Sequence, residues 1–330
     1  MKKILILTTG GTIASRDTER GLAPAISSDE LVGYVPELAD IAHITARSLF
    51  CIDSTNIRAE HYIMMVRAIR EHYADFDGFV ITHGTDTMAY TAAALSYMIQ
   101  NSKKPIVLTG SQKSIYLRDT DARGNLIGAL MYAACEYASG VSVVFDGKVI
   151  IGTRAQKTRT KSFNAFSSID YPELAKIRDG RVINYITQSV EGDPIFYDRL
   201  SPEIFVYKLI PGADPHILRC LQGRYRAVII ESFGVGGIPR SEDGDFIGAL
   251  RELIDAGVVI VMTTQVSHEG SDMEIYEVGQ AAKLELDLME AYDMTTEAIS
   301  TKLMWILGQT DDKDRIRELF CTPIAHDIIR

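Results

Sequence analysis

The chain has 330 residues, more than the roughly 100 to 200 residues of a typical domain, so we expect two domains or one large α/β unit. Hydrophobic residues make up 46% of the sequence and charged residues 24%, which is ordinary globular usage and excludes disordered and fibrous classes. The formal net charge is -10 and no block of Lys or Arg stands out. These charges argue against nucleic-acid binding and favour a small-molecule partner.

The first apolar run, residues 4–7, is too short for a signal peptide and ends in Thr and Gly, so we expect a first β-strand there. No apolar stretch reaches the roughly 18 residues that a membrane span requires, which favours a cytoplasmic protein without a membrane partner. The four cysteines are scattered without the spacing of a zinc site or a disulfide framework. We expect reduced, partly buried thiols at Cys51, Cys135, Cys220 and Cys321.

Short apolar runs alternate with helical patterns in the first half of the chain, which indicates a parallel β-sheet. The expected strands are residues 3–7, 78–82, 105–109 and 141–145. Between them, residues 58–73 place Ile63, Val66 and Ile69 at helical spacing, and residues 86–100 are expected to form a second amphipathic helix. Helices should therefore cover both faces of the sheet.

The alternation lapses in a polar segment with Pro and Gly, QSVEGDPIFYDRLSPE, and resumes after it. We expect an N-terminal α/β domain over residues 1–190, a linker over 191–203 and a smaller C-terminal α/β domain over 204–330. The expected strands and helices of the second domain are residues 204–209, 227–231, 258–262, 295–307 and 311–319.

Several expected strands end in Thr, Ser and Gly, as in ILILTTGGT, FVITHGTDT and IVLTGSQ. Ligands of open α/β sheets bind outside the carboxyl ends of the strands, so these turns should outline a hydroxyl-rich pocket. The sequence contains no GxGxxG, GxxxxGK[ST], GxSxG or HExxH motif. Nucleotide-binding, serine-hydrolase and zinc-protease interpretations therefore lose support.

Two of these turns carry candidate reactive groups. Thr12 follows the first strand and two glycines that permit a tight turn and a close approach of backbone to ligand. Taken alone, its hydroxyl is better explained as a cap of the following turn. His83, Gly84, Thr85 and Asp86 follow another strand and open a helix, so amides and the Thr85 hydroxyl should face the same crevice as Thr12.

The remaining charged candidates have ordinary structural explanations when each is considered alone. Asp86 suits the start of a helix, where a carboxylate stabilises the helix dipole, and His83 suits a structural role. Lys157 belongs to the basic segment GTRAQKTRTK, in which a solvated surface position is the default.

The segments TTGGTIAS and THGTDTMAYTAAALSYM together closely resemble the two signatures of the bacterial asparaginase and glutaminase family. The resemblance continues through IDST, VLTGSQ, GTRAQK and ESFGVG, covers nearly the whole chain and is greatest for the cytoplasmic type I branch. It implies hydrolysis of the side-chain amide of L-asparagine to aspartate and ammonia.

By this resemblance, Thr12 is the nucleophile that forms an acyl-enzyme, which water then hydrolyses. Thr85, Asp86 and Lys157 match the family's second hydroxyl, carboxylate and lysine, through which a proton can be drawn from a hydroxyl or a positioned water. Asp86 would also hold the ammonium of the substrate.

The resemblance also assigns the substrate-binding residues. Asp53, Ser54 and Thr55 match the loop that binds the α-carboxylate and α-amino groups, with Ser54 as the main carboxylate contact. Main-chain amides near Gly11, Thr12 and Thr85, together with Gly84 beside them, would contact the substrate and the developing oxyanion. No metal or organic cofactor is implied, and a homodimer or homotetramer is expected.

The segment of residues 15–29 is expected to be a mobile lid over the site, because it is charged, contains Gly and Pro, and lacks a regular apolar period. Many relatives carry a Tyr on this lid that touches the catalytic Thr, whereas Leu22 occupies that place here. The base that activates Thr12 is therefore left open.

Other functions remain as alternatives. One methylene changes binding by only about 1 to 3 kcal/mol, so the sequence leaves asparagine and glutamine as competing substrates. A subunit of a tRNA-linked amidotransferase is a weaker alternative, because the chain begins at the first strand with no extra domain. A two-domain amino-acid binding protein without turnover is the alternative from a different class.

Overall fold

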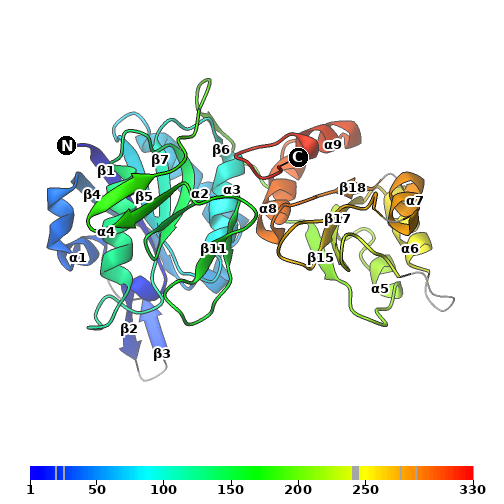
Figure 1. Ribbon diagram of the computed structural model, residues 1–330, viewed down its shortest axis with the longest axis horizontal. Helices are drawn as coiled ribbons and strands as arrows, with labels where there is room; N and C mark the ends of the chain where they lie inside the picture. The colour runs from blue at the N-terminus through cyan, green and yellow to red at the C-terminus, as the bar shows by residue number, and fades with distance from the viewer. Residues whose placement is uncertain (19–20, 25–26, 240–244, 276, 287, 330) are drawn as a thin grey trace. The chain divides into compact units, whose positions relative to one another are not determined.

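The computed structural model describes residues 1–18, 21–24, 27–239, 245–275, 277–286 and 288–329, and only the backbone at 16–18, 21–24, 277–278 and 281. The chain forms two compact units, Met1–Asp198 and Arg199–Arg330. Each unit contains a β-sheet with helices packed on it (Figure 1). The expected class, two α/β domains of which the N-terminal one is larger, is confirmed.

The larger unit is built on an eight-stranded sheet. In spatial order its strands are β13 (Arg181–Asn184), β12 (Ala175–Arg178), β9 (Lys148–Ile151), β8 (Gly140–Phe145), β7 (Pro105–Thr109), β5 (Gly78–Thr82), β1 (Lys3–Gly10) and β4 (His43–Ile52). The five strands from β8 to β4 are parallel, and β9, β12 and β13 continue the sheet antiparallel. The four strands expected in this half of the chain are confirmed.

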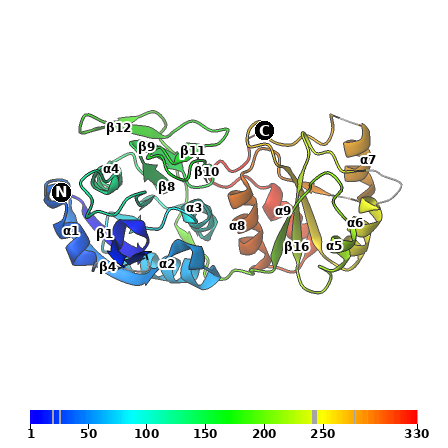
Figure 2. The same ribbon diagram turned by 90° about the horizontal axis from the view of Figure 1, so that it is seen from below.

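Helices cover both faces of this sheet, as expected (Figure 2). On one face, α1 (Ser28–Gly33) and α4 (Ala122–Ala133) enclose a core that includes Ile4 and Ile6 of β1. The other face carries α2 (Ala59–His72) and α3 (Met88–Met98). Both faces of the central strands are buried, which is why their sequences are continuous apolar runs rather than alternating ones.

The two helices on the second face differ in how much of their surface is buried. Helix α2 buries Tyr62, Met65, Val66 and Ile69, which recur at helical spacing and form one apolar stripe. All residues of α3 except Tyr90 are buried. The expected amphipathic pattern of α3 is therefore wrong, because this helix packs against the sheet, α2 and β10 (Ala155–Lys157) at once.

Among the described residues, three short antiparallel pairs complete the larger unit. They are β2 (Ser15–Thr18) with β3 (Gly21–Pro24), β6 (Ile99–Gln100) with β14 (Ile195–Phe196), and β10 with β11 (Phe166–Ser168).

The smaller unit has a four-stranded parallel sheet in the order β15 (Ile204–Lys208), β16 (Ala227–Ser232), β17 (Val259–Thr264) and β18 (Met289–Glu290). Its helices are α5 (His216–Arg219), α6 (Phe246–Asp255), α7 (Glu277–Leu286), α8 (Thr296–Leu307) and α9 (Lys313–Cys321). The expected strands and helices of this half are confirmed within one or two residues at most ends. Helices α5, α6 and α7 share one core with β16 and β17.

Candidate active site

Strands β1 and β5 lie side by side at the point where the strand order of the larger sheet reverses. The chain passes from β1 to β4 on one side and then returns to β5 on the other side of β1. The two strands are parallel and in register up to Thr8 and Thr82, so both end at the same edge of the sheet. Ligands of open α/β sheets bind at such a switch point, outside the carboxyl ends of the strands.

The turns that follow β1 and β5 touch one another through two glycines. Gly11 has a φ of 80°, and a Cβ atom placed on it would collide with the backbone of Gly84. A Cβ atom on Gly84 would in turn collide with the side chain of Ser54. Only glycine permits this approach, which brings the segments before Thr12 and Thr85 together.

Thr12 begins a single 3-10 turn, Thr12–Ala14, and its side chain is half-buried. The N-cap position of this turn is Gly11, and the hydroxyl of the C-cap residue Ser15 donates to the Gly11 carbonyl at 2.8 Å. Thr12 therefore does not occupy the N-cap position that would explain its hydroxyl as a cap.

Lys157, Thr85 and Asp86 form a hydrogen-bonded cluster at the same edge of the sheet. The Lys157 ammonium donates to Thr85 Oγ1 at 2.8 Å and to Asp86 Oδ1 at 2.6 Å. The exposed fraction of the side chain is 15% for Lys157 and 58% for Asp86, and Thr85 is buried. The buried Thr85 hydroxyl thus contacts the Lys157 ammonium, whose charge is balanced by the solvent-exposed Asp86 carboxylate.

A short β-hairpin carries Lys157 to this cluster. Lys157 is the last residue of β10, which pairs with β11 so that Lys157 lies opposite Phe166. Ala155 and Phe166 are buried, and β10 packs against α3, the helix that follows Thr85 and Asp86. The packing of the hairpin on α3 explains how a lysine with no local signal reaches the turn after β5.

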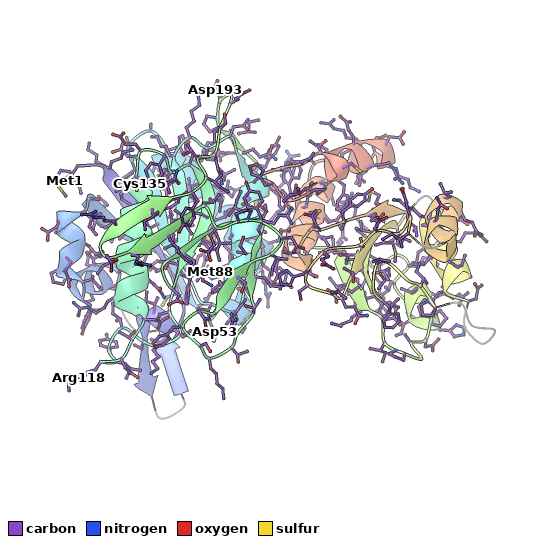
Figure 3. The ribbon with its side chains drawn as sticks, viewed as in Figure 1. Met1, Asp53, Met88, Arg118, Cys135 and Asp193 are labelled. Atoms are coloured by element: carbon purple, nitrogen blue, oxygen red, sulfur yellow. The ribbon has the colours of Figure 1, made fainter. Side chains whose placement is uncertain are left out.

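Of the three substrate-binding residues expected after β4, Asp53, Ser54 and Thr55, only Ser54 lies against the turn that follows β5. Ser54 is buried against Gly84, and its carbonyl accepts a hydrogen bond from the Thr87 hydroxyl at 2.8 Å. Figure 3 shows the neighbouring Asp53 and Met88 in this part of the larger unit. Asp53 and Thr55 are exposed, and the Asp53 carboxylate accepts hydrogen bonds from the amide and hydroxyl of Thr55, both at 2.8 Å.

His83 is a buried neutral residue behind the turn. Its Nδ1 lies 2.7 Å from the Gly84 carbonyl and its Nε2 lies 3.0 Å from the Thr91 hydroxyl. Burial lowers the pKa of His83 to about 4, so the imidazole is uncharged at neutral pH. Nδ1 then carries the proton, because the carbonyl can only accept, and Nε2 accepts from Thr91.

Gln112 is a polar residue of the site to which sequence reasoning gave no role. Thr85 Oγ1 donates to Gln112 Oε1 at 3.3 Å, and Gln112 Nε2 donates to the Ser162 carbonyl at 3.2 Å. A usable signal was present, because Gln112 closes the segment VLTGSQ at the end of the expected strand 105–109.

Most side chains of the segment expected to form a lid, residues 15–29, lie outside the described part of the structure. The backbone of residues 15–18 pairs with that of 21–24 as β2 and β3, with Asp17 opposite Leu22. The Leu22 side chain and residues 19, 20, 25 and 26 lie outside the described residues. Closure of the lid and the role of Leu22 stay predictions.

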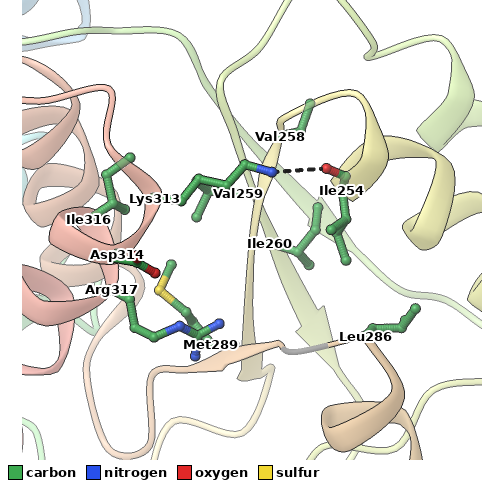
Figure 4. Close-up of a pocket in the computed structure, with 10 residues that line it drawn as sticks. All are labelled: Ile254, Val258, Val259, Ile260, Leu286, Met289, Lys313, Asp314, Ile316 and Arg317. Carbon is green, nitrogen blue, oxygen red and sulfur yellow. Dashed lines mark hydrogen bonds between the residues drawn. The ribbon is translucent and has the colours of Figure 1, made fainter.

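A separate cavity of about 190 Å³ lies in the smaller unit (Figure 4). Aliphatic side chains of α6, β17 and α9 form much of its wall, and the Lys313 ammonium donates to the Ile254 carbonyl at 3.3 Å. No hydroxyl or thiol is among the residues drawn there, whereas the turn after β1 carries the Thr12 hydroxyl. The lining residues are Ile254, Val258, Val259, Ile260, Leu286, Met289, Lys313, Asp314, Ile316 and Arg317.

Three further features concern the described part of the chain. No helix in it is both long and apolar enough to cross a membrane. Within the same residues, His, Cys, Asp and Glu side chains form no group of three or more that could hold a metal ion. The four cysteines are free thiols in it, and Cys135 and Cys321 are partly buried. Cys51 and Cys220 are exposed, so the expected partial burial is wrong for these two.

Comparison with known families accounts for nearly the whole chain. The model of the N-terminal asparaginase domain matches residues 3–190, and that of the glutaminase/asparaginase C-terminal domain matches residues 203–320. The chain belongs to the asparaginase and glutaminase family. These matches show the family but not the bacterial branch that the sequence resemblance names.

The chain is similar to two groups of relatives within this family. An L-asparaginase from Thermococcus kodakarensis is 40% identical over 328 residues, which cover 99% of each chain. A glutamyl-tRNA(Gln) amidotransferase subunit from the same organism is 35% identical over 343 residues, and the match covers 99% of this chain and 77% of that relative. The asparaginase is thus matched along almost its full length, whereas part of the amidotransferase subunit has no counterpart in the match.

Solved asparaginase structures have the same fold. The thermostable L-asparaginase from Thermococcus kodakarensis superposes with a TM-score of 0.92 at 39% identity, covering 99% of each chain. L-asparaginase I from Vibrio cholerae gives a TM-score of 0.89 at 28% identity, covering 100% of this chain and 99% of that one. A probable cytoplasmic L-asparaginase from Campylobacter jejuni gives 0.83 at 27% identity, with coverage of 97% and 99%.

Proposed function

We propose that this protein hydrolyses the side-chain amide of L-asparagine to L-aspartate and ammonia. The observation that carries the proposal is the Lys157 ammonium, which contacts both Thr85 and Asp86 beside the turn that presents Thr12. Family membership and the full-length match to an L-asparaginase support the same activity.

In the proposed reaction, Thr12 Oγ attacks the amide carbon and forms a C–O bond. The tetrahedral intermediate collapses as the C–N bond breaks, and the proton from the hydroxyl ends on the leaving nitrogen as ammonia. Water then adds to the ester, the C–O bond to Thr12 breaks, and aspartate leaves with the hydroxyl restored. The half-buried position of Thr12 at the start of its turn supports this assignment, since Gly11 and not Thr12 is the N-cap.

Thr85, Lys157 and Asp86 act in this proposal as one proton-transfer unit. Lys157 exchanges protons with the Thr85 hydroxyl or a water beside it, and Asp86 compensates the charge of the ammonium. The 2.8 Å and 2.6 Å contacts of the Lys157 ammonium support this arrangement. Asp86 is 58% exposed, so its carboxylate can also accept the ammonium group of an amino-acid substrate.

The proposed substrate contacts surround the two glycine turns. Ser54, buried against Gly84, binds the α-carboxylate, and Asp53 and Thr55 hold the loop that presents Ser54. Main-chain amides at Thr12 and Thr85, next to Gly11 and Gly84, stabilise the oxyanion of the tetrahedral intermediate. The close approach of the two turns supports this proposal, because it places backbone amides from two strand ends in one region.

A steady-state ammonia assay with L-asparagine, L-glutamine and D-asparagine tests the function directly. We expect turnover of L-asparagine at a kcat/KM at least about tenfold above that for the other two amides. Comparable rates with L-glutamine would support the glutaminase-asparaginase alternative. Binding of L-asparagine by calorimetry without ammonia release would instead support a binding protein, and ammonia release only with a partner enzyme and tRNA would support an amidotransferase subunit.

We further propose the family branch, the cellular location, the oligomeric state and the domain boundaries of this protein. The similarity to L-asparaginase I from Vibrio cholerae and to a probable cytoplasmic L-asparaginase supports a cytoplasmic type I enzyme. We propose a homodimer or homotetramer, which light scattering of the purified protein tests. The family models end at residue 190 and resume at 203, which supports 191–203 as the connection between domains.

A further inference from the structure

We propose that Gln112 is a positioning residue that sets the direction of the Thr85 hydroxyl and braces the connection that follows Lys157. The proposal rests on the hydrolytic function proposed above, because it assigns Gln112 a part in the proton-transfer unit of that reaction. Three observations carry it: the backbone anchor of Gln112, the fixed orientation of its amide, and the short hairpin that bears Lys157.

The backbone of Gln112 is held by a carboxylate from the turn before α4. The amide N–H of Gln112 lies 3.1 and 2.9 Å from the two carboxylate oxygens of Asp121, and the amide of Lys113 donates to the same carboxylate at 3.0 Å. Asp121 is itself held by Asn125, whose buried side chain donates to it at 3.1 Å. The backbone from which the Gln112 side chain extends is therefore held in place by Asp121.

The side-chain amide of Gln112 has one favourable orientation. Its Nε2 faces the Ser162 carbonyl, which can only accept a hydrogen bond, so the NH₂ group must point there. Oε1 consequently faces Thr85 and must accept its hydroxyl proton. The Thr85 oxygen already accepts from Lys157, so both partners together fix the hydroxyl in one direction.

This direction matters for proton transfer. In the resting state the Thr85 proton points to Gln112, and a lone pair of its oxygen points to the Lys157 ammonium. The second lone pair of the oxygen then remains for a water or a substrate group. Without Gln112 the hydroxyl could rotate among three staggered positions, and the oriented state would be populated only part of the time.

Gln112 also braces the segment that carries Lys157. Lys157 ends β10, a strand of three residues, and the chain continues through an exposed connection to β11. Ser162 lies in this connection, so its contact with Gln112 joins the hairpin to the anchored turn after β7. The side-chain amide of Gln112 thus links the Thr85 hydroxyl to the β10–β11 hairpin, which carries Lys157.

Two substitutions separate these contacts. Gln112→Met keeps the length of the side chain and removes both hydrogen bonds, whereas Gln112→Glu keeps an acceptor for Thr85 and loses the donor to Ser162. Gln100→Met is the matched control, because Gln100 donates only to the Tyr97 carbonyl three residues before it among the bonds described. For each variant we would measure kcat, KM for L-asparagine, the melting temperature and hydrogen exchange over residues 158–165.

We expect Gln112→Met to lower kcat about tenfold, the effect of losing the one hydrogen bond that orients Thr85, with KM within about twofold of wild type. Gln112→Glu should retain at least about three times the kcat of Gln112→Met, and both should speed exchange over 158–165. Melting temperatures should stay within about 2 °C of the control.

Several results would overturn the proposal. One is a kcat for Gln112→Met equal to that of Gln100→Met, and another is a loss of kcat matched by a rise in KM and a fall in melting temperature. If wild type hydrolyses no amide, the proposed function fails, and hydrogen exchange alone then decides: unchanged exchange over 158–165 in Gln112→Met overturns the bracing role, and faster exchange establishes it.

Discussion

The Lys157 ammonium lies 2.8 Å from the Thr85 hydroxyl oxygen, although the two residues are 72 positions apart in the sequence. The same ammonium contacts the Asp86 carboxylate, so a cation, a hydroxyl and an anion meet at the end of β5. This contact motivates a prediction about how the two residues act together.

Lys157→Met and Thr85→Val should each lower kcat by about 100-fold or more, since general acid–base groups contribute on that order. The double variant should be little slower than either single one, because each change already disables the shared unit. Steady-state kinetics of the three variants checks this. Losses that multiply would show that Lys157 and Thr85 act independently.

Thr12→Ala should lower kcat by more than about a thousandfold, as removal of a nucleophile does in other hydrolases. The change removes one hydroxyl from a half-buried side chain, so the melting temperature should fall by less than about 4 °C. Thr12→Ser is the matched control, because it keeps a hydroxyl at the same place. Substantial ammonia release by Thr12→Ala would refute the nucleophile assignment.

His83 should make the protein less stable in acid. Burial lowers its pKa from 6.5 to about 4, so the unfolded chain binds a proton between these values while the folded protein does not. The stabilisation is therefore present above pH 6.5 and is lost as the pH falls toward 4, by roughly 3 kcal/mol.

Urea unfolding of wild type and His83→Gln at pH 7.5 and pH 4.5 isolates this contribution, because other titrating groups are common to both proteins. His83→Gln should be less stable than wild type at pH 7.5 and should lose less stability on acidification. An equal loss in the two proteins would contradict the prediction.

The smaller unit contains an ion pair with no exposed side-chain surface, in which Lys302 of α8 contacts Asp327 at 2.7 Å. Burial lowers the pKa of Lys302 although Asp327 opposes the shift. Asp327→Asn should cost about 3 to 5 kcal/mol of unfolding free energy, because it leaves an uncompensated buried charge.

Lys302→Met combined with Asp327→Leu should cost much less than the sum of the single changes, since the pair is removed together. Denaturant unfolding of the three variants measures the coupling. Additive losses would show that the two side chains contribute to stability separately.

Much of the fold was predictable from the sequence because it depends on local patterns. Strands buried on both faces, such as β5 and β7, are continuous apolar runs, and both expected ranges agree with the structure to the residue. Strand β4 was missed, because this edge strand is only partly buried and its sequence HITARSLFCI has no continuous apolar run. The amphipathic expectation for α3 was wrong because neighbours on several sides bury this helix.

The sequence by itself also determined which turns carry hydroxyl groups and that parallel strands would gather them at one edge. Only the tertiary structure decided that β1 lies beside β5, that Gly11 meets Gly84, and that Lys157 reaches Thr85. The partners of Gln112, which are Thr85 and Ser162, were also decided only there. The physical reason is that periodicity reports which face of an element is buried, whereas a contact between distant segments depends on how the elements pack.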